Sequence, residues 1–105
     1  MDTARIYENK AGQVDRVARK KSGTSPTYPS DRVPRLKSGE RVSVSISFLV
    51  TEKGTVEGIE VTESAGSIID DVVTTAVGTW KYEPATIRGT PVKVRILIRQ
   101  TFLGS

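Results

Sequence analysis

One stretch decides the fold of this chain: Val42-Ser43-Val44-Ser45-Ile46-Ser47-Phe48-Leu49-Val50. Apolar side chains recur at every second residue, and serines stand between most of them. A period of two is the spacing of a β-strand that buries one face and leaves the other in contact with solvent. The stretch therefore predicts a half-buried strand with an apolar face and a serine-rich face.

The residues after this strand predict a hairpin. The segment Thr51-Glu52-Lys53-Gly54-Thr55 is short and polar, and its glycine can adopt the positive φ of a tight turn. A second strand is expected from Val56 to Thr62, with Ile59 and Val61 on one face. Because the connection is tight, we expect the two strands to pair in antiparallel orientation.

Further along the chain, the apolar residues change to helical spacing. Ser64-Ala65-Gly66 ends the second strand, and Ser67 with Asp70 forms a capping-box-like pair at a helix start. We expect the helix between Ser67 and Lys81, because Pro84 prevents its continuation. One buried stripe at helical spacing is predicted. It consists of Ile68, Ile69, Val72, Val73, Ala76, Val77 and Trp80.

The chain ends with a long strand. Residues 86–90 are expected to form a loop, and alternation then resumes from Val92 to Phe102, with Lys93, Arg95 and Arg99 on the polar face. These elements predict an α+β fold, a small antiparallel sheet of three or more strands with one amphipathic helix packed on one face. Three strands cannot close a barrel, so the sheet keeps edges with unpaired backbone groups.

The first quarter of the chain is polar and weakly patterned. Residues 1–27 are expected to be a basic lead-in or linker, with room for one short extended segment around residues 13–19, and residues 28–105 to be the folded domain. The chain has 16 Lys and Arg against 12 Asp and Glu among 105 residues. Residues 1–40 hold nine of the basic and five of the acidic side chains, so the whole excess of 9 − 5 = +4 lies there.

The composition excludes several kinds of site. Without cysteine or histidine, the chain cannot build Cys/His zinc sites, cysteine nucleophiles or Ser-His-Asp triads. Asp70 and Asp71 are neighbours on the predicted helix and point apart, so they suit a helix start rather than a catalytic pair. We therefore expect no catalytic residue, no metal site and no cofactor. The sequence also has neither a run of about 20 apolar residues nor a signal-peptide pattern at its start.

Several short motifs together resemble the C-terminal domain of TonB-type energy transducers. They are Tyr28-Pro29, Gly39, Phe48-Leu49-Val50, Gly54-Thr55-Val56, Ser64-Ala65-Gly66, Trp80-Lys81-Tyr82-Glu83-Pro84-Ala85, Gly89, Pro91-Val92 and Phe102. The resemblance covers about residues 26–105. The chain departs from the family pattern in two places. Arg32-Val33-Pro34 interrupts the short helix usual after Tyr-Pro, and Ala18 stands where a proline is usual.

The resemblance implies a non-enzymatic periplasmic module, the soluble C-terminal part of an inner-membrane-anchored protein. Such a module docks a peptide of an outer-membrane or envelope partner by β-strand addition. It transmits force from an inner-membrane proton-motive complex through upstream parts, without inserting into a membrane itself. The last strand is the implied binding element, with the Tyr-Pro element beside it. Carried over by position, the partner-binding residues are Tyr28, Pro29, Val92, Lys93, Val94, Arg95, Ile96, Leu97, Ile98, Arg99, Gln100 and Thr101.

Two other interpretations stay open at this point. The basic residues Arg16, Arg19, Lys20 and Lys21 could contact the phosphates of a nucleic acid. Nucleic acid is nevertheless the less favoured partner, because the six aromatic residues do not form the aromatic-basic pattern of an RRM-type sheet. Alternatively, two copies could pair edge to edge as a homodimer. Trp80 is expected, like Tyr82, to pack in the core rather than to form a ligand platform.

Overall fold

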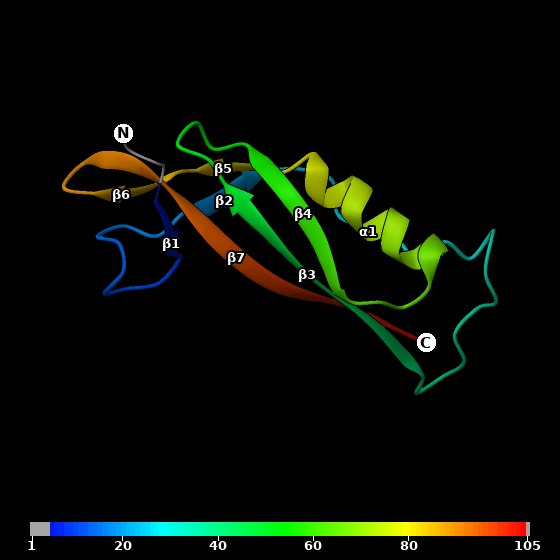
Figure 1. The fold of residues 1–105 in the computed structure, drawn as a ribbon. Coiled ribbons are helices and arrows are strands. Elements are labelled where there is room, and N and C mark those ends of the chain that lie inside the picture. The colour runs from blue at the N-terminus through cyan, green and yellow to red at the C-terminus, as the bar shows by residue number, and fades with distance from the viewer. Residues whose placement is uncertain (1–4, 105) are drawn as a thin grey trace.

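A computed structural model describes residues 5–104 of the chain and shows one helix packed on a mixed β-sheet (Figure 1). The elements are β1 (Ile6–Glu8), β2 (Arg19–Ser22), β3 (Arg41–Val50), β4 (Val56–Glu63), α1 (Ser67–Gly78), β5 (Lys81–Glu83), β6 (Ala85–Ile87) and β7 (Thr90–Leu103). The main sheet has the order β1-β7-β3-β4 with β6 beside β7, and a second sheet pairs β2 with β5. The predicted α+β fold is confirmed, and the sheet is mixed because β1 runs parallel to β7.

The alternating strand β3 lies inside this sheet, between β7 and β4. β3 pairs in antiparallel orientation with β7 on one side and with β4 on the other. Its even-numbered side chains face the core, where Phe48 is 1% exposed. The ring centroid of Phe48 lies 6.2 Å from that of Trp80 and 6.0 Å from that of Tyr82. The predicted core positions of Trp80 and Tyr82 are thus confirmed, since both side chains are buried.

The helix is shorter than predicted at its C-terminal end. α1 ends at Gly78 rather than at Lys81, because residues 81–83 form β5 and pair with β2. Trp80, which continues the helical spacing, lies in the turn between them, and its backbone N–H donates to Val77 O at 3.0 Å. Four apolar side chains of the helix are buried against the sheet. They are Ile69, Val73, Ala76 and Val77, whereas Ile68, which was expected to be buried, is 37% exposed.

The start of the helix is also built differently from the prediction. Gly66, with φ of 102°, occupies the N-cap position, so the expected cap by Ser67 is wrong. The Asp70 carboxylate instead accepts hydrogen bonds from the backbone N–H of Ala65 at 2.8 Å and from the hydroxyl of Ser64. An acidic group in the first turn stabilises the positive end of the helix.

Residues 86–90, expected to be a loop, belong to a second hairpin. β6 pairs with the first three residues of β7. Arg88 with φ of 52° and Gly89 with φ of 79° form the two-residue turn. Two consecutive positive φ angles are typical of a type I′ turn, whose twist matches that of the strands that it joins. The Asp15 carboxylate accepts a hydrogen bond from the backbone N–H of Arg88 and fixes this turn.

The N-terminal residues contribute two short strands. β1 pairs with β7, and β2 pairs with β5. The Asn9 side-chain amide exchanges hydrogen bonds of 2.7 and 3.2 Å with the backbone of Ala18. The side chains of Ala18 and Val14 are buried. The Lys20 ammonium lies 3.9 Å from the ring centroid of Trp80. These residues therefore pack on the sheet, and where the domain begins stays a prediction.

Candidate docking edge of the sheet

β7 is paired along one side and open along much of the other (Figure 1). It pairs with β3 over ten residue pairs in one continuous register, from Arg41–Leu103 to Val50–Val94. On the opposite side, β1 pairs with Lys93, Val94 and Arg95. Within residues 5–104, no strand pairs with that side between residues 96 and 103. This segment is therefore an open sheet edge.

The register indicates which backbone groups of β7 face the open side. The N–H of Gly104 donates to Glu40 O at 2.8 Å, directly opposite in the register of the ten pairs. Bonded and non-bonded pairs alternate in an antiparallel ladder, so the even-numbered residues of β7 direct their backbone groups toward β3. The odd-numbered residues direct their backbone groups away from β3. The 3.3 Å hydrogen bond from Asn9 N–H to Arg95 O on that side is consistent with this assignment. The open backbone groups are those of Leu97, Arg99, Thr101 and Leu103.

The side chains of β7 give the two faces of this edge different chemistry. On the helix side, Ile96 and Ile98 are half-buried and pack at the margin of the core. On the other face, Leu97 is 67% exposed, and the Arg99 guanidinium lies 3.6 Å from the Glu63 carboxylate. An added strand would therefore meet apolar side chains on one face, and Leu97 together with positive charge on the other.

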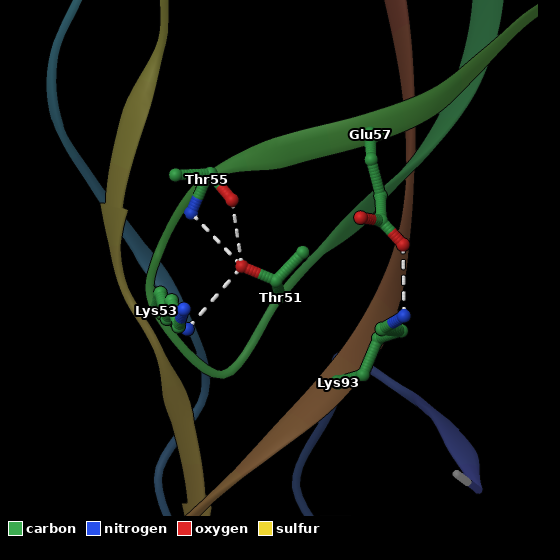
Figure 2. Close-up of polar contacts among 5 residues, drawn as sticks. All are labelled: Thr51, Lys53, Thr55, Glu57 and Lys93. Atoms are coloured by element: carbon green, nitrogen blue, oxygen red, sulfur yellow. Dashed lines mark hydrogen bonds and ion pairs between the residues drawn. The ribbon is translucent and has the colours of Figure 1, made fainter. Parts of the chain in front are cut away.

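Polar contacts fix the sheet at the N-terminal end of β7. The Lys93 ammonium donates to Glu57 Oε2 at 2.8 Å and so ties β7 to β4 across the end of β3 (Figure 2). This hydrogen bond with Glu57 raises the pKa of Lys93. In the β3–β4 turn, the Thr51 hydroxyl lies 2.7 Å from the Thr55 hydroxyl and accepts hydrogen bonds from the N–H groups of Lys53 and Thr55. The positive charge of Lys93 is thus already engaged within the sheet.

Tyr28 and Pro29 lie at the opposite, C-terminal end of β7. The Tyr28 ring packs edge-on against Phe102, with the ring centroids 5.6 Å apart. Its hydroxyl donates to Pro34 O at 2.7 Å, and Pro29 is buried. Residues 32–34, which depart from the resembled family pattern, therefore belong to a turn that Tyr28 closes against the end of the strand.

The structure divides the predicted binding residues into separate groups. Residues 28–29 pack near the end of β7, and residues 96–101 lie along the open edge. Residues 93–95 are covered on that side by β1, while Val92 pairs with β6. Residues 102–103, which sequence reasoning did not include, continue the open edge. The alternation that ends in phase at Phe102 was the signal that could have extended the prediction.

β4 forms the other edge of the main sheet, and it is irregular. Its pairing with β3 shifts register twice, and Gly58, which lies within the second shift between Glu57 and Glu60, has φ of 62°. Bulges of this kind bend a strand and hinder the addition of a further strand. The residues opposite the serine-rich face of β3 are acidic. They are Glu57, Glu60 and Glu63.

A hollow of about 530 Å³ lies on the helix side. It separates residues 24–32 from α1, and Tyr28, Pro29, Asp31 and Asp71 are among its lining residues. The part of the chain that the structure describes contains no group of three or more acidic side chains placed to hold a metal ion. It also contains no helix of the length and hydropathy that crossing a membrane requires.

A protein-family model matches most of the chain. It is the model of the Gram-negative bacterial TonB protein C-terminal, and it matches residues 24–103. The matched residues include the helix and the strands β3 to β7, whereas β1 and β2 precede them. No curated protein matches the chain.

Proposed function

Since the chain belongs to the family of TonB C-terminal domains, non-enzymatic energy-transducer domains of the periplasm, we propose that its open β7 edge docks a partner peptide. The observation that carries this proposal is the regular, open side of β7 over residues 96–103. A peptide that adds there as a strand gains backbone hydrogen bonds along its length. Tyr28 and Pro29 flank the end of this edge and would border the docked peptide.

The peptide that fits this edge alternates apolar residues with acidic or polar residues. Every second side chain of an added strand would pack on Ile96 and Ile98. The side chains between them would lie beside Arg95 and Arg99, whose charge favours acidic groups. The family points to an outer-membrane protein as the source of such a peptide.

Strand addition also suits the transmission of force. When a paired strand is pulled along its axis, its backbone hydrogen bonds bear the load together. β7 is held on its other side by the ten-residue pairing with β3, so the load would pass into the centre of the sheet. We infer that the domain is the C-terminal part of an inner-membrane-anchored protein, which a proton-motive complex moves through upstream parts.

A pair of substitutions at Arg99 tests the docking proposal. Arg99→Pro removes an outward N–H and places a ring on the open side, so we expect peptide affinity to fall at least about tenfold. Arg99→Ala is the matched control, because it removes the charge and keeps the N–H. The probe is a labelled octapeptide that alternates glutamate with valine, and its binding is measured by fluorescence anisotropy. If Arg99→Pro is folded by circular dichroism and binds like the unchanged protein, the docking edge lies elsewhere.

A further inference from the structure

We propose that β1 is a built-in occupant of the docking edge, and that its release extends the edge from residues 96–103 to residues 93–103. This inference rests on the proposed docking function. It concerns residues 6–8, which precede the part of the chain that the family model matches. Docking in the manner of the family therefore does not require β1.

β1 occupies the position beside β7 that a docked strand would take if it extended over residues 93–95. Its three residues pair in parallel orientation with residues 93–95 of β7, on the side opposite β3. The N–H of Asn9 donates to Arg95 O, and from there the chain turns away. The open edge begins at the next residue of β7, Ile96. A strand docked on residues 96–103 would therefore be collinear with β1, and β1 limits how far it can extend.

β1 also carries the side-chain pattern that this edge is expected to select. Tyr7 is opposite Val94, is half-buried and packs against the core. The Glu8 carboxylate lies 4.0 Å from the Arg95 guanidinium. Tyr7 and Glu8 thus match one apolar and one acidic position of the proposed peptide, whereas Ile6 places an apolar side chain on the charged face. β1 is thus a short strand of the same chain that pairs with this edge, as a docked peptide would.

The contacts of β1 are weak enough for it to be displaced. It has three residues, whereas a typical strand has about 5–6. Ile6 is 39% exposed, and the Glu8–Arg95 pair lies at the surface, where ion pairs contribute little. Firm attachment begins at Asn9, whose side chain bonds to the backbone of Ala18. β1 and the N–H of Asn9 can therefore leave β7 as a local unit, while the Asn9 side chain and residues 10–22 keep their contacts.

A reversible lock tests this inference. The chain has no cysteine, so Glu8→Cys combined with Arg95→Cys introduces a single disulfide between directly opposed residues. The probes are the octapeptide of alternating glutamate and valine and an undecapeptide of the same pattern. We expect the oxidised form to bind the undecapeptide about tenfold more weakly than the reduced form, because about two to three backbone hydrogen bonds are lost. The octapeptide should bind both forms equally.

A release variant in the full chain gives an independent measurement. In a parallel pair, alternate residues face the neighbouring strand, so the N–H of Tyr7 points to β7 as that of Asn9 does. Tyr7→Pro removes this donor and frees the edge at residues 93–95. We expect the variant to bind the undecapeptide more tightly than the unchanged protein. In the unchanged protein only the molecules with β1 released can bind the full undecapeptide, so the apparent affinity is lowered in proportion to their fraction.

The outcomes separate this inference from the docking proposal. Suppose that the octapeptide binds every form and that the undecapeptide binds the oxidised and the reduced form with equal affinity. In that case β1 does not compete with a docked peptide for residues 93–95. The docking proposal then stands. If the lock does not form, equal undecapeptide affinity of Tyr7→Pro and the unchanged protein overturns the inference in the same way. If neither peptide binds any form, the docking proposal fails and the role of β1 fails with it.

Discussion

β4 and β7 flank the same central strand (Figure 1), yet their open edges differ in regularity and in charge. β7 keeps one register with β3 over ten pairs, whereas β4 shifts register twice. β7 carries Arg95 and Arg99 on the face where β4 carries Glu57, Glu60 and Glu63. The two edges therefore offer a partner strand very different templates.

Under the docking proposal, this difference explains why a partner strand would add to β7 rather than to β4. Charged side chains alone do not decide the matter, because both edges carry them and charges often protect an edge from unwanted pairing. Regularity does decide it, since an added strand needs evenly spaced donors and acceptors along its length. The bulges of β4 interrupt that spacing, and β7 preserves it over residues 96–103.

The largest expected effect separates the two sides of β7. Ile98→Pro removes an N–H that is directed at β3 and leaves the buried acceptor of Ile46 unpaired, so it should lower the free energy of unfolding by about 1–3 kcal/mol. Arg99→Pro changes an N–H on the open side and should leave the protein folded. Urea denaturation followed by circular dichroism measures both. Equal losses for the two variants would contradict the assignment of which side of β7 is open.

Charge reversal on each edge gives a smaller effect. Arg99→Glu should weaken binding of the glutamate–valine octapeptide about tenfold and favour a lysine–valine octapeptide instead. Glu60→Lys on β4 is the matched reversal. A strand docked on β7 lies about three strand spacings of 4.8 Å from β4, beyond the Debye length of about 8 Å at physiological salt. We therefore expect Glu60→Lys to change affinity less than about twofold, and a comparable effect of both reversals would place the peptide elsewhere.

The smallest expected effect concerns the bulge of β4. Gly58→Ala should cost about 1 kcal/mol of folding stability, because φ of 62° is unfavourable for a residue with a Cβ. The new Cβ would meet Leu49 Cδ1 at 3.5 Å, an ordinary contact, so the cost comes from the backbone. Gly78→Ala at the end of α1 is the control, since that glycine has no positive φ. Thermal unfolding should show unchanged or higher stability for the control, and equal losses would show that the bulge does not depend on this angle.

Elements with several turns or alternations could be predicted from the sequence, and the shortest ones could not. The alternation in β3 and β7 and the helical stripe of α1 extend over enough residues to reveal their period. β1, β5 and β6 have three residues each, and no period is visible over that length. Trp80 continued the helical spacing although the helix ends at Gly78, because a turn after a helix can place a side chain on the same face.

The sequence by itself determined which faces of β3, β7 and α1 are buried, where the charge lies, and which family motifs are present. Each of these is a local property, since it depends on residues two to four positions apart. Only the tertiary structure decided that β7 is paired on one side and open on the other, and that β1 covers residues 93–95. The pairing of Tyr7 with Val94 joins residues far apart in the chain. The direction of a backbone N–H in a sheet depends on such a neighbour, which local spacing cannot specify.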